Sequence, residues 1–146
     1  MAMFQSFEIN ASGMTAQRFR SDIISENIAN VNTTSTEDGT PYTRKVVTFQ
    51  EKGVNGFEDY LRKARGDLIG NGVKITTVSE DHSSEYKMEY DPSNPDADEN
   101  GYVTYPNVNI VTEMTNLIDA SRAYEANATA FEASKGMAQL GLNIGQ

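Results

Sequence analysis

The C-terminal part of this chain carries an apolar stripe that constrains its fold more than any other feature. Mostly apolar or small residues recur there at alternating spacings of four and three: Ile110, Met114, Leu117, Ser121, Tyr124, Ala128, Phe131, Lys135, Ala138 and Leu142. This alternation predicts a long α-helix over residues 109–144 that carries a coiled-coil seam. Such a helix cannot cover its apolar face alone, so it must pack against another helix, in its own chain or in a neighbour.

A second apolar stripe lies off this seam. Its members are Val111, Ile118, Met137, Leu140 and Ile144. Small residues are frequent between residues 120 and 138, which either reflects the high helix propensity of alanine or lets a neighbouring backbone come close. Two stripes exceed what a single partner helix needs, so the sequence favours several neighbours and points to assembly rather than catalysis.

Residues 3–31 also predict a helix. Its apolar residues begin at 3-4-3 spacing and then drift onto two tracks: Phe4, Phe7, Ala11, Met14, Ala16, Phe19, Ile23, Ile24, Ile28 and Val31. A drifting stripe suits either a helix wedged into a globular core or one with neighbours on several sides. Because Gly13 costs about 1 kcal/mol relative to Ala inside a helix, we expect a break or a late start near Asn10–Gly13.

The middle of the chain reads as short strands and turns. Residues 46–49, 73–77, 86–90 and 102–105 alternate or cluster as strands do, and residues 57–65 suit a short helix or a loop. Asn109 is a reasonable N-cap for the last helix, and Glu113 lies near its positive end. The predicted fold is α+β, with long terminal helices packed as a coiled-coil-like pair and a small β-rich middle region with a thin core.

Charge and composition exclude several classes of protein. The net charge is -9, and most of it lies in the middle region. Such an acidic surface argues against nucleic acid or anionic membranes as partners. The chain has no cysteine, which excludes disulfides and thiol chemistry. We see no transmembrane run and no cleavable secretory signal, so we expect any export to use another route.

Three candidate sites for chemistry are weak. Residues 96–101 copy the first half of an EF-hand loop, but position 12 is Asn107 instead of Glu, and prolines leave no room for flanking helices. His82, the sole histidine, stands among adjacent residues in a segment, 80–85, that reads as a solvated turn, whereas triads gather separated residues. A carboxylate pair for glycoside hydrolysis stays open, although the thin middle region offers little room for a sugar. We therefore expect no catalytic residue, no metal and no cofactor.

Three motifs together resemble the flagellar basal-body rod protein family. The first is Asn27-Ile28-Ala29-Asn30-Val31-Asn32-Thr33-Thr34, followed by Gly39-Thr40-Pro41-Tyr42-Thr43-Arg44-Lys45. The others are the segment from Asp91 to Asp98 and the run from Tyr105 to Asn127. The first motif resembles rod and hook proteins in general. The three together, in a chain this short, are most similar to the small proximal-rod members of the family.

This resemblance implies a structural subunit of the proximal rod that assembles with itself and with related proteins into a torque-transmitting driveshaft. Residues 1–35 and 107–146 would form an inner tube domain, and residues 36–106 a β-rich region outside it. Ile28, Ala29, Asn30, Thr33, Gly39, Tyr42 and Arg44 would hold the turn after the first helix. The expected assembly contacts are Phe4, Phe7, Met14, Phe19, Ile24, Ile28, Ala29, Asn30, Met114, Leu117, Arg122, Tyr124, Glu125, Asn127, Phe131 and Leu142.

The same resemblance implies the partners and the location. They are other copies, other rod proteins, the flagellar type III export apparatus and the membrane ring, in the bacterial flagellar basal body. Export across the cytoplasmic membrane would need no cleaved signal.

Arg122 and Glu125, three residues apart, could pair along one helix or reach a neighbouring subunit. Two rival readings remain, a wall-degrading hydrolase and a calcium-dependent adhesion module.

Overall fold

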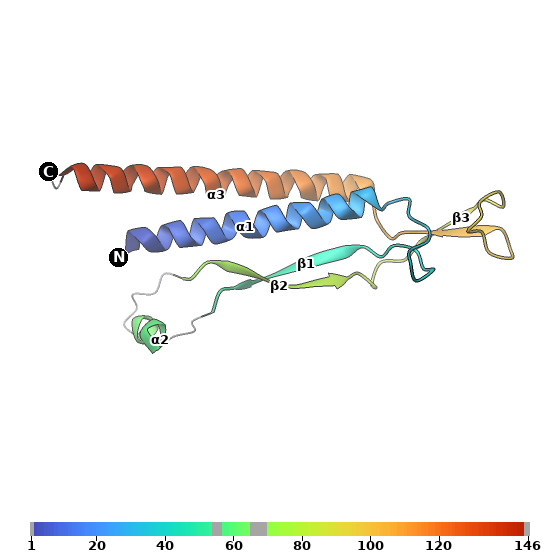
Figure 1. The fold of residues 1–146 in the computed structure, drawn as a ribbon, viewed down its shortest axis with the longest axis horizontal. Helices are drawn as coiled ribbons and strands as arrows, with labels where there is room; N and C mark the ends of the chain where they lie inside the picture. Colours follow the sequence, from blue (N-terminus) through green and yellow to red (C-terminus); the bar gives the residue numbers. More distant parts are fainter. Residues whose placement is uncertain (1, 54–56, 65–69, 145–146) are drawn as a thin grey trace. The chain divides into compact units, whose positions relative to one another are not determined.

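The fold consists of two long terminal helices and a middle region of short strands, as the α+β prediction requires (Figure 1). The computed structural model describes residues 2–53, 57–64 and 70–144. The elements in chain order are α1 (Ala2–Ala29), β1 (Lys45–Glu51), α2 (Phe57–Ala64), β2 (Val73–Glu80), β3 (Lys87–Tyr90), β4 (Tyr102–Tyr105) and α3 (Ile110–Ile144). Among the described residues, no helix is both long and apolar enough to cross a membrane.

The strands of the middle region form two separate two-stranded sheets. β1 pairs with β2, and β3 pairs with β4. The second pair is an antiparallel hairpin in which Lys87 lies opposite Tyr105 and Tyr90 lies opposite Tyr102. Gly101 has a φ of +81° in the turn that leads into β4, a conformation that favours glycine. All four predicted strands are therefore confirmed, and each sheet is small.

The chain divides into two compact units, each built from separated segments. Residues 1–19, 48–77 and 120–146 form the first unit, and residues 20–47 and 78–119 form the second. In the first, the rings of Phe7 and Phe131 meet edge to face with centroids 5.0 Å apart. In the second, the amide of Asn27 donates to the carboxylate of Glu113. Each unit thus contains its own contact between α1 and α3.

The predicted break near Asn10–Gly13 is wrong, because α1 runs without interruption from Ala2 to Ala29. Gly13 lies directly against α3: a Cβ at this position would stand 2.7 Å from Oδ1 of Asn127. The missing side chain therefore allows close approach of the two helices, and that packing outweighs the propensity cost of glycine.

The face of α3 that is covered within the chain differs from most of the predicted seam. The buried residues of α3 are Glu113, Ala120 and Ser134, whereas four members of the seam are 41 to 74% exposed: Ile110, Met114, Tyr124 and Leu142. Small side chains such as Ala120 and Ser134 on the covered face let α1 and α3 come close together, as they do at Gly13 and Asn127. The other two large apolar residues of the seam, Leu117 and Phe131, are half-buried.

Candidate functional site: a buried polar cluster at the end of α1

The most specific arrangement in the second unit is a network of polar side chains around Asn27. This residue lies in the last turns of α1, and its side chain is 1% exposed. Its Oδ1 accepts from the hydroxyl of Tyr42 and from the backbone N–H of Lys45, both at 2.9 Å. Its Nδ2 donates to the carbonyl of Lys45 and to Oε2 of Glu113. Every hydrogen-bonding position of this buried amide is therefore satisfied, as burial demands.

A buried ion pair continues this network. Oε1 of Glu113, from the first turn of α3, accepts from Arg44 Nε at 3.0 Å and from Arg44 Nη2 at 2.8 Å. The third guanidinium nitrogen, Nη1, reaches Oδ2 of Asp81 at 3.2 Å. Burial alone would lower the pKa of Arg44, but hydrogen bonds and the charges of Glu113 and Asp81 outweigh it and raise this pKa. The guanidinium therefore stays charged between two carboxylates.

Asp81 and Asn107 connect this pair to the segments around it. The hydroxyls of Ser83 and Ser84, followed by the backbone of Ser83 and the Arg44 side chain, hold the pKa of Asp81 far below its usual range. Asn107 accepts from the backbone N–H of Arg44 at 2.8 Å and donates to the carbonyl of Asp81 at 2.6 Å. The reading of residues 80–85 as a solvated turn is thus wrong for Asp81, because its carboxylate faces Arg44.

Burial also shifts the titration of Tyr42. Burial, followed by the negative charges of Glu26, Glu113 and Glu80, raises the pKa of its phenol to about 12. Its hydroxyl donates to Asn27, and its ring lies 5.7 Å from the ammonium of Lys45. Tyr42 therefore acts as a neutral hydrogen-bond donor at physiological pH.

Four of the residues that the resemblance implies for the turn after α1 take part in it: Asn30, Thr33, Gly39 and Tyr42. Asn30 Nδ2 donates to the carbonyl of Glu26, and Thr33 donates to Oδ1 of Asn30. The backbone N–H of Tyr42 donates to the carbonyl of Thr33 at 3.2 Å, and Gly39 has a φ of +73°. These bonds position Tyr42 and Arg44 in the cluster. Since all its groups bind one another, the cluster can hold α1, β1 and α3 together but offers no free acid or base.

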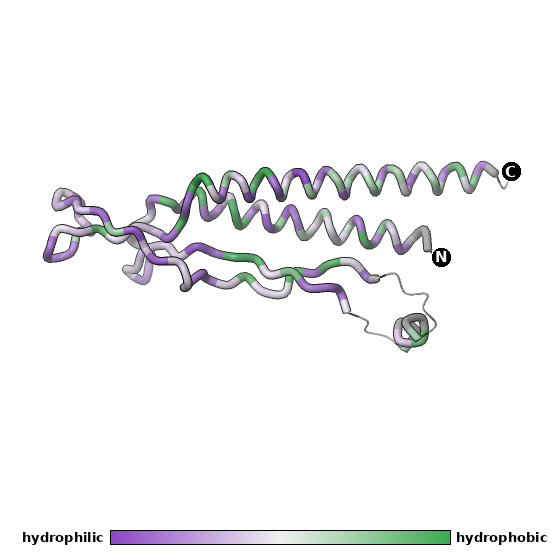
Figure 2. Tube along the Cα trace, turned by 180° about the vertical axis from the view of Figure 1, so that it is seen from behind, coloured by the Kyte–Doolittle hydropathy of each residue, from purple (hydrophilic) through white to green (hydrophobic). Residues whose placement is uncertain are grey.

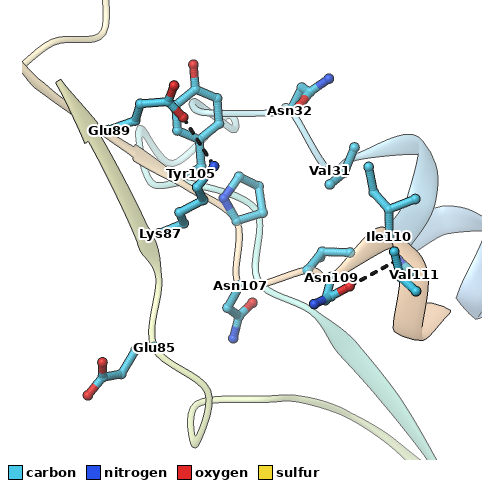
Figure 3. Close-up of a pocket in the computed structure, with 12 residues that line it drawn as sticks. Val31, Asn32, Glu85, Lys87, Glu89, Tyr105, Asn107, Asn109, Ile110 and Val111 are labelled. Carbon is cyan, nitrogen blue, oxygen red and sulfur yellow. Dashed lines mark hydrogen bonds and ion pairs between the residues drawn. The ribbon is translucent and has the colours of Figure 1, made fainter. Parts of the chain in front are cut away.

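A pocket of about 600 Å³ lies beside this cluster in the same unit (Figure 3). Val31 and Asn32 line it from the turn that follows α1, and Ile110 and Val111 line it from the start of α3. β3 contributes Lys87 and Glu89, which pair at 3.2 Å. Oδ1 of Asn109 accepts from the backbone N–H of Val111 at 3.0 Å, which confirms the predicted N-cap. Both apolar and polar residues therefore line the pocket.

The expected assembly contacts fall into different environments. Ile24 is buried inside the chain, and Phe7 and Phe131 contact each other. Asn127 faces Gly13 and donates to the carbonyl of Ala123. Exposed positions are Phe19, Ala29, Met114, Arg122, Tyr124, Glu125 and Leu142, and half-buried ones are Met14, Ile28, Asn30 and Leu117. The side chain of Phe4 lies outside the described residues. Arg122 and Glu125 form no ion pair with any described residue.

The loop 96–101 and His82, which the rival readings would use, make contacts within turns. In the loop 96–101, Oδ1 of Asp98 accepts from the backbone N–H groups of Asn100 and Tyr102, and Asp96 accepts from Thr34. His82 is largely exposed and stands 3.5 Å from Glu80. Within residues 2–53, 57–64 and 70–144, no group of three or more His, Cys, Asp or Glu residues could hold a metal ion.

Sequence reasoning missed the acidic and amide partners of Arg44. Glu113 had been interpreted only through its place near the helix N-terminus, and Asp81 and Asn107 had no expected role. The available signal was chemical: an arginine next to a predicted strand, in a chain with a thin core, needs a carboxylate partner if it is buried. Several acidic residues could have met that need, so the sequence alone did not select these two.

Comparison with known proteins agrees with this architecture. Residues 7–35 match the family model "Flagella basal body rod protein", and residues 99–144 match "Flagellar basal body rod FlgEFG protein C-terminal". The flagellar basal-body rod protein FlgC of Bacillus subtilis is 42% identical, with the whole of both chains covered. That of Borreliella burgdorferi is 44% identical over 99% of this chain and 98% of its own, and that of Salmonella typhimurium is 39% identical over the whole of both. The two matched segments contain most of α1 and all of α3, and these relatives cover 99 to 100% of the chain. The chain therefore belongs to the flagellar basal-body rod protein FlgC family, whose members are structural components of the rod.

Proposed function

We propose that this rod subunit assembles with copies of itself and with other flagellar rod proteins through its terminal helices. Residues 1–35 and 107–146 would form the inner tube of the proximal rod, and residues 36–106 the region outside it. The tube would then transmit torque as a driveshaft. The membrane ring and the export apparatus would be its contacts at the base of the rod.

The observation that carries this proposal is an exposed apolar surface at the start of α3. We call it the α3 patch and define it by Ile110, Val111, Met114 and Ile118, which are 45 to 74% exposed. Figure 2 shows hydrophobic segments, in green, at this end of the helix. Val111, Met114 and Ile118 follow 3-4 spacing and share one face, away from the buried Glu113 and Ala120.

Covering the α3 patch would supply much of the driving force for assembly. Full burial of a large aliphatic side chain stabilises by about 1.5–3 kcal/mol, so the half that remains exposed at each position offers roughly 1 kcal/mol. The polar cluster supports this role because it fixes the start of α3 through Glu113 and Asn27. A patch held on a fixed helix loses little conformational entropy when a neighbour binds.

A matched pair of variants tests the proposal. Ile118→Glu places a charge within the α3 patch, whereas Thr112→Glu adds the same charge at an exposed position of α3 outside it. We expect Ile118→Glu to keep its helical circular dichroism but to be lost from purified basal bodies, and cells carrying it to be non-motile. Thr112→Glu should be incorporated normally. Normal rods with Ile118→Glu would contradict the role of the patch.

Two further parts of the proposal have separate tests. We infer that the chain has no catalytic activity, because the carboxylates of the cluster are engaged with Arg44 and Asn27. A muralytic assay with Glu113→Gln and Asp81→Asn would reveal an acid pair if one acted. We also infer export through the flagellar type III gate without a cleaved signal. Mass spectrometry of the subunit from purified basal bodies should then find an N-terminus at Met1 or Ala2.

A further inference from the structure

The β3–β4 hairpin exposes an aromatic face that none of the preceding roles uses. Side chains alternate along a strand, so Met88 and Tyr90 share one face with the residues opposite them, Thr104 and Tyr102. Met88 is 66% exposed, Tyr90 64% and Tyr102 45%. On the opposite face, Val103 is completely buried. We call Met88, Tyr90 and Tyr102 the hairpin face.

The hairpin face is held in one arrangement before any partner arrives. The rings of Tyr90 and Tyr102 meet edge to face with centroids 5.3 Å apart. Gly101 leaves space for the Tyr90 ring, since a Cβ there would stand 2.9 Å from it. Asp98 accepts from the backbone N–H of Tyr102, and Thr34 anchors the loop by donating to Asp96 at 2.6 Å. Such preorganised tyrosines are typical of the residues that carry binding energy at interfaces.

The charge around the hairpin face selects the chemistry of the partner. The loop that joins the two strands carries Asp91, Asp96, Asp98 and Glu99 and contains no Lys or Arg. Cationic side chains bind the faces of tyrosine rings and pair with carboxylates, and arginine does both with one planar group. The loop carboxylates would repel an acidic partner, and a purely apolar partner would gain no electrostatic attraction from them.

We propose that the hairpin face docks a protein segment that presents arginine or lysine side chains. The cation lies over the Tyr90 and Tyr102 rings, and the carboxylates of the loop surround it. This surface lies within the second unit and involves no residue of the α3 patch. It therefore supplies a contact with a partner that is independent of assembly through the helices.

The test titrates the full chain with a defined probe and follows backbone amides by nitrogen–proton NMR. The probe is the blocked peptide Gly-Arg-Gly-Arg-Gly, and its control replaces both arginines with glutamine. We expect the arginine peptide alone to shift the amides of residues 88–90 and 101–104. Tyr90→Leu, which keeps apolar area but removes the ring, should weaken binding roughly two- to fivefold, the range of one exposed cation–π contact. Tyr90→Phe should bind like the wild type.

Tyr60→Ser is the matched control for Tyr90→Ser, because Tyr60 lies on α2 and is 62% exposed. It should leave binding unchanged, while Tyr90→Ser reduces it. Equal shifts with the glutamine peptide, or equal losses in both serine variants, would overturn the proposal. Shifts produced by a tetramer of N-acetylglucosamine but not by the arginine peptide would also overturn it, in favour of a glycan. The Tyr90 variants leave the α3 patch intact. Their peptide binding is therefore a separate result from the rod incorporation of Ile118→Glu, which tests the patch.

Discussion

At the scale of single residues, Glu113 is a buried charged side chain that joins two parts of the polar cluster. Its side chain is 1% exposed and binds Arg44 and Asn27. Glu113→Gln removes the charge and leaves the Arg44 guanidinium with Asp81 alone. Removing one partner of a fully buried pair costs about 3–5 kcal/mol, and Arg44 is 24% exposed. We expect a loss of roughly 2 kcal/mol in the free energy of unfolding, measured by urea titration.

Glu125→Gln serves as the control for this change, because Glu125 is exposed on the same helix. A surface substitution of this kind stays within about 0.5 kcal/mol of the wild type. If Glu113→Gln is as stable as Glu125→Gln, the ion pair does not hold the cluster together.

Tyr42 gives the cluster a specific response to alkaline pH. Its pKa in the folded chain is raised to about 12, against about 10 in the unfolded chain. The stabilisation from neutral Tyr42 is therefore complete below pH 10 and is lost as the pH rises from 10 to 12, up to about 2–3 kcal/mol. Urea titrations at pH 9 to 12 should show this loss, and Tyr42→Phe should lose less over the same range. Parallel curves for the two proteins would refute this assignment.

At the scale of the helices, the contact between Gly13 and Asn127 should reverse the usual effect of alanine. Replacing glycine by alanine inside a helix normally stabilises by about 1 kcal/mol. At Gly13 the new Cβ would stand 2.7 Å from Oδ1 of Asn127. The Asn127 side chain is held in place because its Nδ2 donates to the carbonyl of Ala123. We expect Gly13→Ala to give no gain or a net loss in the free energy of unfolding.

A double-mutant cycle isolates this contact. In an Asn127→Ala background the obstruction disappears, so Gly13→Ala should recover the gain of about 1 kcal/mol. Gly136→Ala is the matched control, because a Cβ at Gly136 meets nothing within 4 Å, and it should stabilise the wild type directly. A similar gain from both alanines in the wild type would show that the helices do not meet at Gly13.

The elements themselves were largely predictable from the sequence, because they depend on local patterns. The alternation at Val73 and Ile75 specified a strand, and Asn109 specified the start of α3. The inward face of α3 was not predictable in the same way. Apolar periodicity marks the largest hydrophobic stripe, whereas close helix packing selects small residues such as Ala120 and Ser134. The stripe and the covered face therefore differ.

At the scale of the whole molecule, the polar cluster was the feature that local patterns could not supply. Asn27, Arg44 and Glu113 belonged to segments that the sequence had already marked, but their mutual contact depends on how distant segments fold together. Asp81 lay in a segment that was interpreted as a solvated turn, and Asn107 lay in the run from Tyr105 to Asn127 without an expected partner. The resemblance placed Tyr42 and Arg44 at the turn after α1. It gave no information on the carboxylate partners of Arg44, which lie 37 and 69 residues away in the sequence.

The final prediction concerns protection of backbone amides before and after assembly. In the isolated chain the polar cluster anchors α1 near Asn27 and α3 near Glu113, so amides there should exchange slowly. Towards the C-terminal end of α3, Leu140 and Leu142 are exposed and nothing lies within 4 Å of a Cβ at Gly141. Few packed contacts permit local opening at low free energy, so these amides should exchange fast.

In assembled rods, neighbouring subunits would cover these exposed residues, and the difference between the two ends of α3 should disappear. Hydrogen exchange with mass spectrometry, on the dilute chain and on purified basal bodies, measures both states. The Ile118→Glu variant provides the unassembled chain under the same conditions. Slow exchange along all of α1 and α3 in the dilute chain would mean that one copy already covers its own apolar surface, which would remove the physical basis for assembly through the helices.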